Sequence, residues 1–178
     1  QWLLTMVENL LSVTRIQDER GVATVIKTEE SLEEVISSAV GRFRKRFPEV
    51  QVQVCIPESF IMVPMDATLI EQVINNLLEN AYFHSGSHGP IDLQASVDGP
   101  YVSIAIRDQG NGIRPELLGT LFDGGGVSDN QTGDSHKGMG IGLTLCKTII
   151  NAHGGHIEAS NYDKGALFTF TLPDWREY

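Results

Sequence analysis

Residues 66–84 read DATLIEQVINNLLENAYFH and show a clear amphipathic pattern. Apolar residues recur every three or four positions, which predicts a helix that begins after Asp66 and runs to about His84. Polar residues spaced four apart share one surface of such a helix and form a stripe beside the apolar side. The stripe consists of Gln72, Asn76, Asn80 and His84.

The two asparagines of this stripe lower helix stability, because their amides compete for backbone partners. One interpretation is a solvated helix face, and the stripe taken alone favours it. The other is a row of amide oxygens that faces a ligand or a hard cation. Mg²⁺ prefers oxygen ligands and keeps several waters, so one amide oxygen together with phosphates makes a sensible site.

A second motif follows a predicted strand at 102–108, whose apolar residues alternate with others. Asp108 is the next residue on the apolar face, and a buried carboxylate needs hydrogen-bond donors. The chain continues as Asp-Gln-Gly-Asn-Gly, in which Gly110 and Gly112 allow a sharp turn and a close approach to a ligand. An ordinary loop with an Asx turn remains the alternative.

A third motif, GMGIGL at 138–143, opens a predicted helix that runs to about residue 152. Glycines at a helix N-terminus suit a phosphate, because free N–H groups and the helix dipole point there. The spacing fits neither a P-loop nor a dinucleotide fingerprint, and a flexible hinge is the alternative. The polar, glycine-rich stretch 121–137 before it is longer than a usual connection and predicts a lid.

The rest of the chain predicts strands interleaved with helices, and two hairpins. This order favours an α/β fold, a two-layer α/β sandwich whose mixed sheet is covered by helices on one face. Cys55 and Cys146 lie in apolar runs and are expected in the core, and most histidines are expected at the surface or in loops. The further expected helices are 2–16 and 32–47, and the further strands are 22–28, 50–56, 60–63, 91–97, 157–160 and 166–172.

The composition fits one globular domain: 178 residues, 41% hydrophobic. A formal charge of -10 argues against a nucleic-acid partner. Two distant cysteines favour a reduced compartment, and no apolar run approaches the roughly 20 residues that span a bilayer. Because the chain opens at Gln1 within a helical pattern, we expect it to be a fragment of a longer protein.

The motifs in their order resemble the N, G1, F, G2 and final glycine boxes of sensor histidine kinases. That family has the Bergerat ATP-binding fold shared with gyrase, Hsp90 and MutL. The resemblance covers roughly 32–173, and the stretches 63–72 and 149–155 look most like the potassium-responsive members. The blocks that carry it are 76–81, 108–112, 121–123, 138–143 and 165–170.

The resemblance implies a role for each matched residue. Asn80 would ligate Mg²⁺ on the ATP phosphates, Asn76 would support the phosphate side, and both would be the catalytic residues. Asp108 would accept a hydrogen bond from the adenine amine. Family members usually carry lysine where this chain has Phe83. The rest of the implied ATP-binding set is His84, Gly110, Gly112, Ile113, Lys137, Gly138, Met139, Gly140, Ile141, Gly142 and Leu143, of which Lys137 or His84 would replace the lysine.

The resemblance also implies an activity, namely transfer of the ATP γ-phosphoryl group to a histidine outside this chain and onward to a response regulator receiver domain. Residues 1–20 would end the second helix of the dimerisation hairpin, and residues 21–178 would form the catalytic domain with its lid at 121–137. The full-length protein would be a homodimer in the bacterial inner membrane, with this domain in the cytoplasm.

Three alternatives remain open. The first is an ATPase or chaperone of the same fold, although it needs a carboxylate where Asn76 stands. The second is a non-catalytic nucleotide sensor, which Phe83 and the glycine-rich lid suggest. The third is an interaction module without a nucleotide.

Overall fold

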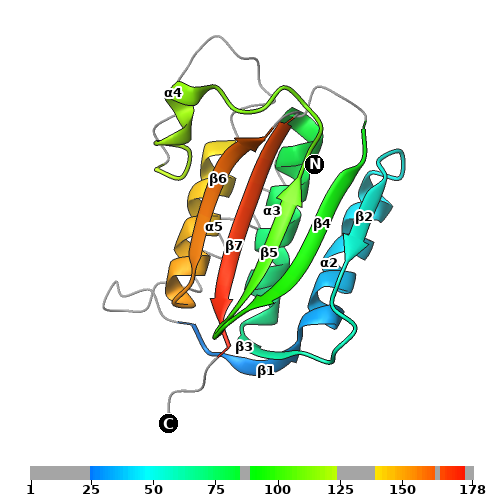
Figure 1. Cartoon of the computed structure of the whole chain (residues 1–178), viewed down its shortest axis with the longest axis vertical. Coiled ribbons are helices and arrows are strands. Elements are labelled where there is room, and N and C mark those ends of the chain that lie inside the picture. Colours follow the sequence, from blue (N-terminus) through cyan, green and yellow to red (C-terminus); the bar gives the residue numbers. More distant parts are fainter. Residues whose placement is uncertain (1–24, 85–88, 124–138, 163–164, 175–178) are drawn as a thin grey trace.

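The computed structural model describes residues 25–84, 89–123, 139–162 and 165–174. A mixed sheet forms one layer, and the three longer helices cover one of its faces (Figure 1). The predicted two-layer α/β sandwich is therefore confirmed. None of the described helices combines the length and the apolar composition needed to cross a lipid bilayer.

The main sheet has five strands in the order β2-β4-β5-β7-β6. β2 and β4 are parallel, and all other neighbours are antiparallel, including the two predicted hairpins. A separate antiparallel pair, β1 with β3, lies at one end of the domain (Figure 1). The strands are β1 Thr28–Ser31, β2 Val52–Cys55, β3 Met62–Met65, β4 Ile91–Asp98, β5 Tyr101–Arg107, β6 His156–Tyr162 and β7 Gly165–Pro173.

The helices begin where the sequence supplies caps. Ser31 Oγ accepts the Glu34 N–H at the start of α2 (Leu32–Arg46), and Asp66 Oδ1 accepts the Leu69 N–H at the start of α3 (Ala67–His84). The predicted helix Met139–Ala152 is α5. A short helix, α4 (Pro115–Leu118), was not predicted.

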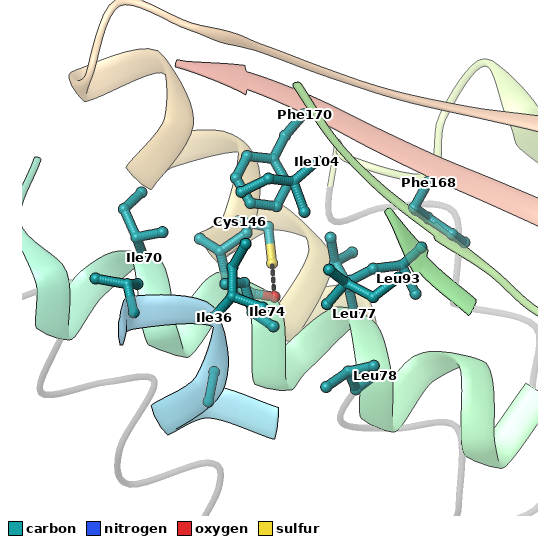
Figure 2. Packing of buried hydrophobic residues seen from close by; sticks show 14 of the residues in the cluster. Ile36, Ile70, Ile74, Leu77, Leu78, Leu93, Ile104, Cys146, Phe168 and Phe170 are labelled. Atoms are coloured by element: carbon teal, nitrogen blue, oxygen red, sulfur yellow. Dashed lines mark hydrogen bonds between the residues drawn. The ribbon is translucent and has the colours of Figure 1, made fainter. Parts of the chain in front are cut away.

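The core fills the space between the helices and the sheet. Figure 2 shows Ile70, Ile74 and Leu77 of α3 directed towards Phe168 and Phe170 of β7, and all five are at most 1% exposed. Burial of such side chains contributes roughly 1.5–3 kcal/mol each. α3 is therefore held firmly against the sheet, which fixes the polar stripe along its flank.

Three predicted strands are displaced. The strand expected at 22–28 is β1, which begins only at Thr28, because pairing with β3 rather than the local apolar run decides its position. β3 itself starts at Met62 instead of residue 60, and Phe60 is 77% exposed. β2 is shorter than 50–56, and only its first residue is buried, because an edge strand has one neighbour.

One prediction about the cysteines is wrong. Cys55 is exposed at the end of the edge strand β2, whereas Cys146 is buried as expected. His153 is fully buried and is an exception to the expectation that most histidines lie at the surface or in loops. The helix predicted at 2–16 lies outside the described residues.

Candidate functional site

Asp108 follows β5 and is 4% exposed, as its place after an apolar strand predicted. Its Oδ1 accepts the Gly110 N–H at 2.9 Å and the Ala166 N–H at 3.2 Å. Its own N–H donates to the Ala166 carbonyl at 3.1 Å. Two backbone donors thus stabilise the buried carboxylate and fix its orientation. Oδ2 is the oxygen that neither of these donors uses.

The β6–β7 hairpin packs tightly on Asp108. A side chain at Gly165 would overlap the Asp108 carbonyl, so only glycine fits there. The Tyr162 hydroxyl donates to the same carbonyl, and the Arg107 guanidinium lies 4.9 Å from the centre of the Tyr162 ring. Burial raises the pKa of Tyr162, so the phenol keeps its proton and remains a donor.

The loop after Asp108 carries the next predicted residues, Gly110, Gly112 and Ile113. Gly112 has φ 77°, a left-handed conformation that glycine adopts readily. The Asn161 side chain of β6 binds both backbone groups of Ile113, with N–H to Oδ1 and Nδ2 to the carbonyl each 2.7 Å. Sequence reasoning missed Asn161, because its partner lies far away along the chain.

Asn80, on α3, is 8% exposed, so the solvated-face interpretation is wrong for this residue. Its Oδ1 is buried, and in the part of the chain that the structure describes it has no hydrogen-bond partner. Such an oxygen costs free energy unless a ligand, water or ion completes it. This orphaned atom fits the oxygen donor expected of a Mg²⁺ site. No cluster of three or more His, Cys, Asp or Glu residues able to hold a metal occurs among the described residues.

Asn76, one turn earlier, connects α3 to α5. Its side chain is half-buried and hydrogen-bonds with the thiol of Cys146. Burial raises the pKa of Cys146 to about 12, and the Asn76 bond opposes this shift. The thiol also donates to the Val73 carbonyl at 3.9 Å (Figure 2), so it stays protonated and acts as a packing group.

The glycine motif before and within α5 is only partly described. Lys137 and Gly138 lie outside the described residues. Met139, Gly140 and Ile141 form the helix start, and the structure describes the helix but not their side chains. Gly142 and Leu143 are buried. His84 ends α3, and its side chain is likewise not described.

The predicted lid is described only at its beginning. Leu121 is 3% exposed, and the Phe122 ring lies 6.3 Å from that of Phe168 in an edge contact. The first residues of the segment 121–137 thus pack on the core, and residues 124–137 lie outside the described chain.

Phe83, at the position where the resemblance implies a lysine, joins an aromatic cluster. Its ring centre lies 4.9 Å from that of Tyr82 and 5.7 Å from that of Phe47, both in edge contacts, although Phe83 is 51% exposed. On the same helix, Glu79 pairs with Arg46 of α2 at 2.5 Å. Phe83 therefore packs the end of α3 against the end of α2.

His153, which sequence reasoning did not single out, ties α5 to the start of α3. Its Nδ1 lies 2.7 Å from the Ile149 carbonyl, and its Nε2 accepts the Asp66 N–H at 3.1 Å. Burial lowers the pKa of His153, which the Ile149 bond partly offsets, so the ring is neutral. Because the end of α5 meets the start of α3, the two helices run antiparallel.

This arrangement brings the predicted residues to one end of the domain. The end of β5, the end of α3 and the start of α5 lie at the same end in Figure 1. Asp108 and its loop stand on the sheet side, and Asn80 stands on the helix side. Asp108 with its loop, Asn80 and the start of α5 therefore lie towards a common end of the domain.

Comparison with known proteins identifies the domain. Residues 65–176 match the family model described as histidine kinase-, DNA gyrase B- and HSP90-like ATPase. The chain is 41% identical over 174 residues to the sensor protein KdpD of Clostridium acetobutylicum, covering 97% of this chain and 19% of that protein. KdpD of Escherichia coli is 34% identical over 169 residues, covering 94% and 18%. The chain thus spans about a fifth of the length of these curated relatives.

Solved structures agree with this assignment. The catalytic domain of the histidine kinase ThkA superposes with a TM-score of 0.72 at 27% identity, covering 84% of this chain and 97% of that domain. The complex of ThkA with the response regulator TrrA gives a TM-score of 0.71 at 25% identity, covering 97% and 48%. The chain belongs to the histidine kinase-, DNA gyrase B- and HSP90-like ATPase family, as an ATP-binding domain of the sensor histidine kinase type.

Proposed function

We propose that this chain is the catalytic domain that binds Mg-ATP and transfers its γ-phosphoryl group to a histidine of a dimerisation hairpin in the same protein. One observation carries the proposal. The anchored carboxylate of Asp108 lies at the same end of the domain as the Asn80 oxygen, which has no partner among the residues that the structure describes. One group suits a base with an exocyclic amine, and the other suits a cation on phosphates.

On the base side, Asp108 Oδ2 is the acceptor offered to the adenine amine. The backbone donors on Oδ1 hold the carboxylate in place, so little freedom is lost when the base binds. Gly110 and Gly112 let the loop pass close to the base, and Ile113 adds an apolar contact.

On the phosphate side, Asn80 Oδ1 would hold Mg²⁺, and Asn76 would support the phosphates. When bound, Mg²⁺ supplies charge neutralisation at the phosphate oxygens, which the acidic chain lacks. Gly138 and the start of α5, from Met139 to Leu143, would present backbone N–H groups to the phosphates. Lys137 or His84 would supply the positive charge that Phe83 does not.

The acceptor and the partner follow from the same proposal. Residues 1–20 would belong to the second helix of the dimerisation hairpin, and residues 21–178 would form the catalytic domain. The full-length protein would be a homodimer of the bacterial inner membrane, with this domain in the cytoplasm. A response regulator receiver domain would accept the phosphoryl group, and the ThkA–TrrA complex is a relative with such a partner.

An ATPase of the same fold is the rival function. Such an enzyme needs a general base to activate water, and the Asn76 amide cannot accept a proton. Rapid steady-state ATP hydrolysis by the isolated chain would favour the rival. We expect slow hydrolysis, together with phosphorylation of an added hairpin that carries the acceptor histidine.

The direct test is calorimetric titration of the chain with a non-hydrolysable ATP analogue, with Mg²⁺ and with a chelator. We expect binding in both conditions and tighter binding with Mg²⁺. Thermal unfolding provides a second readout, because a ligand at 100 times its Kd adds about 2.7 kcal/mol of stability. No heat and no thermal shift at millimolar analogue would reject the proposal in favour of an interaction module.

A further inference from the structure

The loop that follows Asp108 is held by a side chain outside the sequence motifs. Asn161 accepts the Ile113 N–H and donates to the Ile113 carbonyl, both at 2.7 Å. A side-chain amide satisfies both backbone groups of one residue in this way, as a neighbouring strand would. Ile113 is in the segment 108–114, which contains no helix or strand, so this pairing replaces the missing ladder.

The same hairpin holds the other end of the loop. Tyr162, next to Asn161, donates to the Asp108 carbonyl, and the Ala166 N–H of β7 donates to the Asp108 carboxylate. Gly112 packs so closely on Asn161 that a side chain at Gly112 would come within 2.8 Å of Asn161 Oδ1. β6 and β7 thus anchor the segment 108–114 at Asp108 and at Ile113.

The two glycines make this anchoring necessary. Gly110 and Gly112 let the backbone approach a ligand, but they also leave the loop many alternative conformations. Asn161 removes those alternatives by fixing Ile113 relative to the sheet. A loop fixed before binding loses less entropy when the ligand arrives, which favours affinity.

We propose that Asn161 is a positioning residue for the nucleotide: it fixes the loop Gly110–Ile113 against β6 and thereby sets the affinity for the base. This inference rests on the proposed function, because the base is the ligand that the loop would face. In this proposal Asn161 acts through Ile113 and does not contact the nucleotide itself.

The test compares Asn161→Ala with the wild-type chain in calorimetric titrations with an ATP analogue. We expect Kd to rise about tenfold, because the loss of a hydrogen bond that holds the loop should weaken binding by about that factor. The increase should be the same with Mg²⁺ and with a chelator, because the loop serves the base and not the metal. Asn161→Asp keeps the acceptor for the Ile113 N–H but sets a carboxylate oxygen against the Ile113 carbonyl, so its Kd should also rise above the wild-type value.

Hydrogen exchange separates this inference from the proposed function. In the nucleotide-free protein, the Ile113 amide should exchange faster in Asn161→Ala than in wild type, while amides in the middle of β5 keep their rates. Ser160→Ala is the matched control, because Ser160 is exposed on the same strand, and it should change neither exchange nor Kd.

Each outcome decides a different statement. If the wild-type chain binds no nucleotide, the proposed function fails, and the role of Asn161 in nucleotide affinity fails with it. If wild type binds and Asn161→Ala binds equally well, the inference is overturned while the proposed function stands. The third outcome is that Kd rises, the urea midpoint falls and amides exchange faster throughout the sheet. Asn161 would then have a general structural role, and the inference would be overturned.

Discussion

The Asp108 loop and the Asn80 region of α3 lie at one end of the domain, but their buried oxygens differ in hydrogen bonding. Asp108 Oδ1 has two backbone donors, and the loop around it is anchored by β6 and β7. Asn80 Oδ1 is also buried, but it has no partner in the described part of the chain. Under the proposed function, the base side is therefore built by the protein alone, whereas the phosphate side would be completed by what binds there.

The largest effect that would test this contrast is expected at Asp108. Asp108→Ala leaves the Gly110 and Ala166 N–H groups without their acceptor, so unfolding free energy should fall by about 1–3 kcal/mol. Nucleotide affinity should fall at least about a hundredfold. Urea unfolding and calorimetry measure the two losses. Glu158→Ala is the control, because Glu158 is exposed on β6. If Asp108→Ala has the same unfolding free energy as wild type, the Asp108 carboxylate does not anchor the structure.

The opposite pattern is expected at Asn80, whose Oδ1 has no hydrogen-bond partner among the described residues. Asn80→Ala should change unfolding free energy by less than about 1 kcal/mol, because the unsatisfied oxygen leaves with the side chain. The Mg²⁺-dependent part of ATP affinity should fall on the order of tenfold or more. Titrations with Mg²⁺ and with a chelator separate this loss from base binding, which should be unchanged.

Asn80→Asp sharpens the same prediction, since it keeps the shape and adds a charge near the phosphates. We expect an altered metal dependence and strongly reduced phosphorylation of an added histidine-bearing hairpin. A wild-type phosphorylation rate in this variant would remove Asn80 from the site.

A smaller effect is expected at Phe83, where packing and charge compete. Phe83→Lys should tighten Mg-ATP binding several-fold by placing a cation near the phosphates. It should also cost about 1 kcal/mol of stability, because the edge contacts with Phe47 and Tyr82 are lost. Phe83→Met is the matched control, as it loses the aromatic contacts without adding charge. Equal affinity of Phe83→Lys and wild type would show that this position does not face the phosphates.

The smallest effect concerns pH and the start of α3, far from either oxygen. Burial holds the pKa of His153 below its usual value of 6.5, so the unfolded chain binds a proton more readily than the folded one. The contribution of His153 is therefore complete above pH 6.5 and declines as the pH falls below 6.5 towards the folded-state pKa. His153→Phe should flatten this part of the stability profile, which urea unfolding at a series of pH values measures. A wild-type slope in His153→Phe would exclude the buried ring as its source.

Local patterns predicted much of this architecture. α5 has the predicted bounds, and the burial of Asp108 followed from its place on an alternating strand. α3 begins after the predicted cap Asp66. In each case, the residues that determine the structure lie close together along the chain, so a local sequence pattern is enough to predict it.

Features that depend on distant partners could not be predicted. β1 is a polar strand whose position is set by its pairing with β3, and the apolar run before it was misleading. Asn161 and His153 act on residues 48 and 87 positions away, and neither belongs to a local pattern that indicates its partner. The burial of Asn80 likewise depends on how α3 sits against the rest of the domain, so two interpretations of its stripe remained open until the fold was known.

The pairing of β5 with β7 has a consequence for how the domain is made. A chain synthesised from its N-terminus contains α3 and Asp108 well before Asn161 and Ala166 exist, and the Asp108 N–H finds its acceptor only on Ala166. During that interval the loop has no anchor, so under the proposed function the nucleotide would have no formed base site to stabilise. ATP would then stabilise only the nearly finished domain, in which the remote strands β5 and β7 have already paired.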